Sequence, residues 1–194
     1  MGLLKKWQVE NSSTLELANN LAEVKDSSIT TAKLAFGTWQ KIAEIEVTSD
    51  TNQVNITGLD GDNDKVYCVI ARIVNADTSG NRTFYFRFND DTATNYTMQR
   101  LRGEYSSSII NQGDATFTAF AEATAGQVVG ATSFIYAQSG QNRTVIAYSG
   151  CGNGVSVFSG RWNNSTDNIT KINIVAEGTY IGAGSKFILL KLSS

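Results

Sequence analysis

The sequence predicts an all-β protein, a jelly-roll-like antiparallel β-sandwich preceded by a short N-terminal anchor and oligomerisation segment. Apolar and polar residues alternate with a period of two over about ten short segments after residue 40. Clusters of Gly, Asn, Asp and Ser separate these segments at intervals of about 8–12 residues, and no helical pattern follows residue 36. The strand number is high for an immunoglobulin-like domain and no Cys–Trp–Cys arrangement is present, which favours the jelly roll.

Each strand is expected where the alternation is clearest. Phe84, Phe86 and Phe88 fall on one face of their segment, and Ile172 and Ile174 on one face of theirs, as a half-buried antiparallel strand requires. The expected strands are 41–48, 53–58, 65–75, 83–89, 115–123, 131–138, 143–149, 154–162, 168–176 and 185–192.

The N-terminal segment carries apolar residues that a stretch this short does not bury by folding on itself. The sequence therefore predicts that copies of the chain associate through this segment. The spacing fits either a short helix or an extended ribbon intertwined between copies. A glycine at position 37 marks the boundary between the anchor, 1–37, and the head domain, 38–194. The candidate interface residues are Leu15, Leu17, Leu21, Val24, Ile29 and Leu34.

Composition narrows the classes of function. The chain contains no histidine, which removes the usual nucleophile-activating base and His-ligated zinc. A net charge of −2 provides no electrostatic attraction for nucleic acid or an anionic membrane. No apolar run is long enough to span a bilayer, and the N-terminus lacks the pattern of a secretory signal, so we expect assembly in a cytoplasm without membrane insertion. We expect a non-enzymatic protein without a cofactor or metal.

Three features of the sequence are candidate sites of chemistry. Residues 60–64 (DGDND) resemble a calcium loop, but the positions at which an EF-hand requires Gly and Glu hold Lys65 and Ala71. This favours a hairpin turn over a loose cation site. The glycine-dense stretch 150–154 does not match a phosphate-binding pattern and indicates a loop or hairpin. Cys68 is expected to be a buried apolar residue; its pairing with Cys151 stays open, although a cytoplasmic origin disfavours it.

Aromatic residues near expected loops and strand ends are candidate contacts for a host-surface glycan, because a sugar ring stacks on an aromatic face. Most aromatic residues in a sandwich pack in the core or at an interface, and this remains the alternative. The candidates are Tyr96, Tyr105, Tyr148 and Trp162.

Three stretches resemble virion proteins of phages and archaeal viruses. The sequence VKDSSITTAKLA at 24–35 is similar to a linker in phage tail-fibre and spike proteins. The sequence RFNDD at 87–91, and NITKINI at 168–174 followed by GAGSKFILL at 182–190, resemble the middle and the closing strands of viral structural proteins. The resemblance implies a fibre, spike, turret or capsid-decoration protein of a virion, in contact with other virion proteins and in some cases with a host receptor. Such proteins are usually homotrimers, and the alternative is a pentamer at a five-fold vertex.

The single linker favours a compact decoration, turret or short spike over a long fibre. A carbohydrate-binding module and a polysaccharide depolymerase are the alternative functions, the second requiring a pair of facing carboxylates.

Overall fold

The computed structural model of this chain describes residues 15–18, 21–24, 38–104, 107–152, 154–176 and 181–192. The chain forms two units, Met1–Thr38 with Ser194 and Trp39–Ser193. In the first unit, β1 (Leu15–Ala18) and β2 (Leu21–Val24) pair antiparallel. Leu15 lies opposite Val24. The residues of these two strands, for which the sequence fits either a short helix or an extended ribbon, are therefore extended.

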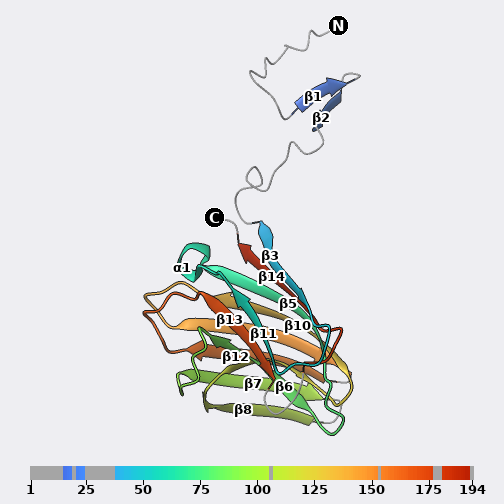
Figure 1. The fold of residues 1–194 in the computed structure, drawn as a ribbon, viewed down its shortest axis with the longest axis vertical. Coiled ribbons are helices and arrows are strands. Elements are labelled where there is room, and N and C mark those ends of the chain that lie inside the picture. Colours follow the sequence, from blue (N-terminus) through green and yellow to red (C-terminus); the bar gives the residue numbers. More distant parts are fainter. Residues whose placement is uncertain are drawn as a thin grey trace. The chain divides into compact units, whose positions relative to one another are not determined.

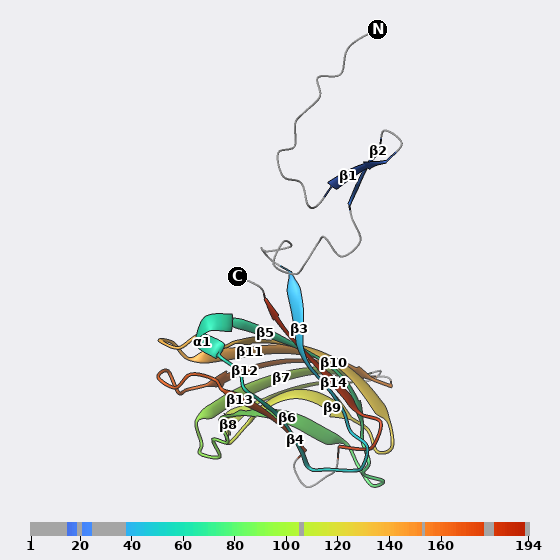
Figure 2. The same ribbon diagram turned by 45° about the horizontal axis from the view of Figure 1, so that its top comes forward.

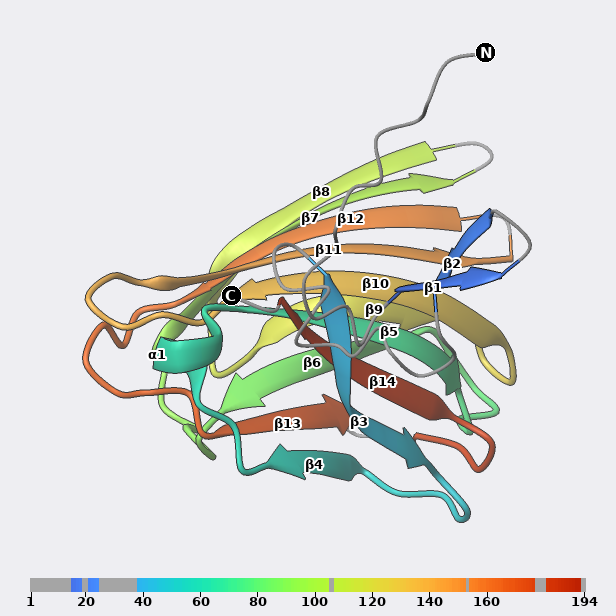
Figure 3. The ribbon, with the colours of Figure 1, turned by 90° about the horizontal axis from the view of Figure 1, so that it is seen from above.

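The second unit is an antiparallel β-sandwich of an eight-stranded and a four-stranded sheet (Figures 1 and 3). The large sheet has the order β3-β14-β5-β10-β11-β12-β7-β8 and the small sheet the order β4-β13-β6-β9. The large-sheet strands are β3 (Trp39–Glu46), β5 (Val66–Val74), β7 (Tyr96–Glu104), β8 (Ser107–Ala115), β10 (Val128–Tyr136), β11 (Arg143–Cys151), β12 (Gly154–Trp162) and β14 (Lys186–Leu192). The small-sheet strands are β4 (Gln53–Thr57), β6 (Arg82–Phe88), β9 (Thr118–Ala123) and β13 (Lys171–Ala176).

Eight of these strands form a jelly roll. Along the chain, β3, β4, β5 and β6 alternate between the two sheets, and β9, β10, β13 and β14 alternate again. Numbered as strands 1 to 8 in that order, they give the two sheets 1-8-3-6 and 2-7-4-5, which is the double Greek key of a jelly roll. The predicted all-β jelly-roll sandwich is confirmed.

Two inserted hairpins enlarge one sheet only. The pair β7–β8 is inserted between β6 and β9, and β11–β12 between β10 and β13. Both hairpins add to the large sheet beyond β10, in the order β11-β12-β7-β8 (Figure 2). The large sheet therefore has twice as many strands as the sheet that packs against it.

The core lies between the sheets and is rich in aromatic residues. Phe84, Phe86 and Phe88 of β6 are fully buried, as their alternation predicts. The ring of Phe86 stacks on that of Phe120 of β9, with centroids 4.0 Å apart. Phe88 joins the two sheets, because its ring centroid is 5.5 Å from that of Trp162 on β12.

The sequence did not predict β7 and β8. The inward positions of β7 include Arg100 and Arg102, which ordinarily indicate solvent exposure. Both guanidinium groups form ion pairs with the buried Glu122 of β9. Because charge pairing replaces apolar contact here, the period-two hydrophobic pattern is lost.

Candidate functional site

The face of the large sheet that points away from the small sheet, here called the outer face, carries an unusual number of apolar side chains. One cross-strand row runs from Ile70 on β5 through Thr132, Tyr148 and Val157 to Leu101 on β7. This row crosses five strands, a span of about 19 Å at the usual strand spacing. Every exposed large hydrophobic residue within the described part of the chain lies on this face, and we call the eight the apolar belt: Trp39, Ile70, Leu101, Val128, Tyr136, Tyr148, Val155 and Val157.

A hollow of about 370 Å³ lies within the apolar belt. Gly130 of β10 and Gly150 of β11 are opposite each other and form its floor, because neither has a side chain. Tyr148 and Val155, which are 52% and 65% exposed, stand beside it. The hollow therefore adjoins two of the most protruding apolar side chains of the face.

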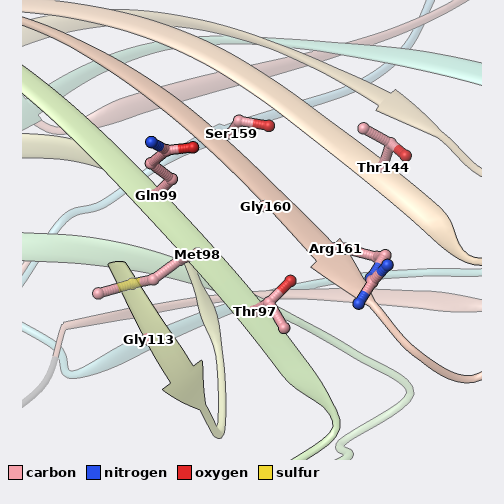
Figure 4. Close-up of a pocket in the computed structure, with 8 residues that line it drawn as sticks. All are labelled: Thr97, Met98, Gln99, Gly113, Thr144, Ser159, Gly160 and Arg161. Carbon is pink, nitrogen blue, oxygen red and sulfur yellow. The ribbon is translucent and has the colours of Figure 1, made fainter. Parts of the chain in front are cut away.

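A second cavity, the polar groove, has a volume of about 590 Å³ and lies over β7, β8, β11 and β12 (Figure 4). Strand register places Thr97 opposite Arg161 and Gln99 opposite Ser159, and Arg161 is also opposite Thr144. Met98, Gly113 and Gly160 complete the lining. All five polar side chains point to the outer face, since they alternate with the buried Phe158, Gly160 and Trp162 and their cross-strand neighbours.

Tyr136 borders the polar groove. It is opposite Thr144 of β11, which is opposite Arg161, so the three residues stand in one row on the outer face. The ring is 46% exposed. Hydroxyl, amide and guanidinium groups thus lie beside an accessible aromatic ring on a rigid sheet, and together they offer both donors and acceptors.

Two of the four predicted sugar contacts are buried, which corrects that part of the prediction. Tyr96 and Trp162 are 0% and 1% exposed and pack against Phe88. The Tyr96 hydroxyl accepts a hydrogen bond from the Phe88 amide, and the Trp162 indole donates one to the Asp91 carboxylate at 2.7 Å. Burial raises the pKa of Tyr96 above its usual value. Neither ring presents a face to solvent.

The other two candidates have different outcomes. Tyr148 is exposed in the apolar belt, and its contact with a glycan stays a prediction. Tyr105 lies outside the described residues. The groove residues Thr97, Gln99, Thr144, Ser159 and Arg161 were not predicted as a site. Thr144, Ser159 and Arg161 lie in strands that the alternation predicts, but the pairing of β12 with β7, which brings Thr97 and Gln99 to them, joins residues about 60 positions apart in the sequence.

The acidic stretch 60–64 forms no hairpin turn, contrary to the prediction. Gly61–Asp64 is a single helical turn, α1, whose N-cap Asp60 accepts a hydrogen bond from the Asn63 amide. The Ser139 amide donates to the Asp62 carboxylate at 2.6 Å, which holds the pKa of that group below its usual value. Asp64 accepts hydrogen bonds from Tyr67 and Lys191. Among the described residues, no three His, Cys, Asp or Glu side chains are grouped to hold a metal ion.

The two cysteines are separate free thiols, with Cys68 buried and Cys151 partly exposed. Cys151 pairs with Gly154 at the junction of β11 and β12, so the glycine-dense stretch lies at a hairpin, as one of the two interpretations had it. Of the candidate oligomer-interface residues, Leu15 and Leu17 lie on β1 and Leu21 and Val24 on β2, whereas Ile29 and Leu34 lie outside the described residues.

Comparison with known proteins assigns neither a family nor a function to this chain. No protein-family model and no curated protein matches the chain. Among solved structures, it is similar to a protein of unknown function from Shewanella oneidensis MR-1, with 10% identity and a TM-score of 0.19 over 82% of this chain and 77% of that chain. A likeness this weak carries no argument. None of the helices in the described residues is long and apolar enough to cross a membrane.

Proposed function

We propose that this chain is a virion structural protein, a capsid decoration, turret or short spike, whose jelly-roll head binds a carbohydrate of the host surface. The polar groove carries the binding part of this proposal. The virion part is supported by the resemblance of the linker 24–35 and of the strands near 87–91 and 168–190 to viral structural proteins.

The chemistry of the groove suits a sugar. Hydroxyl and amide groups of Thr97, Gln99 and Ser159 match the mixed donors and acceptors of a sugar's hydroxyl groups. The ring of Tyr136 offers an apolar face for stacking, while its hydroxyl stays hydrated. Because these residues stand on paired strands, little backbone conformational entropy is lost on binding.

Arg161 adds a preference to this site. Its guanidinium lies in the groove lining and presents several donors in one plane. A planar fork of this kind binds a carboxylate through two parallel hydrogen bonds. We therefore propose that the head prefers acidic sugars, such as those of bacterial capsules and sialylated surfaces, and that it binds them without cleaving them.

A glycan array with the full chain, followed by calorimetry on the best ligand, tests the binding. We expect sub-millimolar affinity, a loss of about tenfold or more in each of the variants Gln99→Ala and Arg161→Ala, and no loss in Thr57→Ala, an exposed position on the small sheet. No binding to any surface polysaccharide would refute the carbohydrate role. Release of reducing sugar by the wild type would instead identify a depolymerase.

The virion assignment and the anchor need their own tests. Mass spectrometry of purified particles should find the chain, and its absence would refute the virion role.

A two-stranded sheet such as β1–β2 is by itself at best marginally stable in water, which supports cover by other copies. We expect a trimer by light scattering, and loss of that trimer in Leu17→Asp/Leu21→Asp with the head still folded. A fully oligomeric variant would contradict the anchor.

A further inference from the structure

Part of the outer face of the large sheet is apolar, although the small sheet covers only the opposite face. In an antiparallel sheet with one solvated face, the outward positions are usually polar. Here the outward positions of β10 include Val128 and Tyr136, and those of β12 include Val155 and Val157. This is the pattern of a sheet that is buried on both sides.

The extent of the apolar belt approaches that of an interface. Its eight side chains are 40% to 65% exposed. Three of them are valines, so about 150 Å² per side chain, the lower end of the range for aromatic residues, applies, and together they present about 600 Å². The largest such patch on a typical monomer is about 300–600 Å², and a stable protein–protein contact buries about 800 Å² on each partner. The belt therefore lies at the upper limit for a monomer and supplies most of one side of a stable contact, with the residues around it supplying the rest.

The shape of the belt fits a second copy of the same surface. Tyr148 and Val155 protrude next to the hollow floored by Gly130 and Gly150, so that protrusion and recess occur together on every copy. A surface that carries both can be complementary to itself. At the β3 edge, Glu44 forms ion pairs with Lys41 and Lys186, which gives the apolar centre a charged rim.

We propose that the apolar belt is a contact between heads, in which a second copy of this chain covers it. The protruding Tyr148 and Val155 of one copy enter the hollow of the other. This assigns Tyr148 to a protein contact, and it adds to the anchor a second association surface that lies within the head. The contact centres on Tyr148 and Val155. The polar groove and Tyr136, which borders it, lie at the rim of this contact, where Tyr136 stays open to a sugar.

The test separates the two association surfaces. The full chain carrying Leu17→Asp/Leu21→Asp removes the contribution proposed for the anchor, and sedimentation velocity over about 1–100 µM then reports association of the heads. We expect a reversible, concentration-dependent increase in mass. Adding Val155→Glu or Leu101→Glu should weaken it about 10- to 100-fold. Thr57→Glu, exposed on the small sheet opposite Lys171, is the matched control and should have no effect.

Each outcome is decisive. Circular dichroism and an unchanged unfolding midpoint should show that both belt variants are folded, and Val155, at 65% exposed, can change without disturbing the core. A monomer at all concentrations in the anchor variant would refute the contact, as would association that Val155→Glu and Leu101→Glu leave unchanged. Self-association without glycan binding would support this contact and refute only the carbohydrate role.

Discussion

Gly160 of β12 allows β9 to approach the large sheet. A Cβ atom at this position would be 2.8 Å from the Cβ of Thr118 and closer still to its hydroxyl, and 3.2 Å from the Thr97 carbonyl oxygen. Carbon atoms in favourable contact are about 3.5–4.0 Å apart. The change Gly160→Ala therefore forces β9 and β12 apart by about 1 Å, or rotates Thr118, which is fully buried.

The expected loss of stability follows from these contacts. Overpacking a core by one methyl group costs about 1–3 kcal/mol. Replacing Gly by Ala recovers about 0.4–1 kcal/mol, because the unfolded chain becomes less flexible. The net loss is about 1–2 kcal/mol, which corresponds to a fall in Tm of about 2–8 °C for a domain of this size.

Urea unfolding followed by tryptophan fluorescence measures this loss. Gly113→Ala is the matched control, since no atom lies within 4 Å of its Cβ position, and it should change the free energy of unfolding by less than about 0.5 kcal/mol. Thr118→Ala removes the nearest atom, a hydroxyl oxygen without a hydrogen-bond partner in the described structure. In that background Gly160→Ala should cost at least about 0.5 kcal/mol less. Equal losses in both backgrounds would refute the steric explanation.

Three further predictions concern hydrogen bonds, pH and the thiols. Trp162→Phe removes the hydrogen bond to Asp91 and should lower the free energy of unfolding by about 1.5–3 kcal/mol, as measured in urea; an unchanged value would contradict the role of that bond. Hydrogen bonds from the Ser79 side chain and amide, then from Arg82, hold the pKa of Asp77 below its usual value, so its contribution is present above about pH 5 and is lost as the pH falls towards the folded-state pKa. The free energy of unfolding of Asp77→Asn, measured against pH, should therefore fall less steeply at acidic pH than that of the wild type. Equal slopes in the two proteins would show that Asp77 does not contribute to the loss of stability in acid. With a thiol reagent, Cys151 should react in the native protein and Cys68, whose pKa is raised by burial, only on unfolding; fewer than two reactive thiols in denaturant would indicate a disulfide.

Alternation predicts those strands whose inward residues are all apolar. Ile172 and Ile174 of β13 are fully buried, and so are the three phenylalanines of β6. Period-two alternation is a local property, so the residues of one strand suffice to reveal it.

The inserted strands and the polar groove depended on contacts between residues distant in sequence. Arg100 and Arg102 face inward and form ion pairs with Glu122, which is twenty or more positions away in the sequence and lies on the other sheet. The five groove side chains come from three strands whose order, β11-β12-β7, is not their order in the chain. No window of sequence contains such a site.

From the sequence by itself came the fold class, most strand positions, and an N-terminal segment rich in apolar residues. Which aromatic residues are accessible was decided by the tertiary structure alone: Trp162 and Tyr96 are buried, while Tyr136 and Tyr148 stand on the outer face. All four lie in strands in which side chains point alternately to the two faces of the sheet. This alternation shows that consecutive residues point to opposite faces, but it does not show which face is buried. Which face of a strand meets the other sheet depends on how the two sheets pack together, which is a long-range property of the fold.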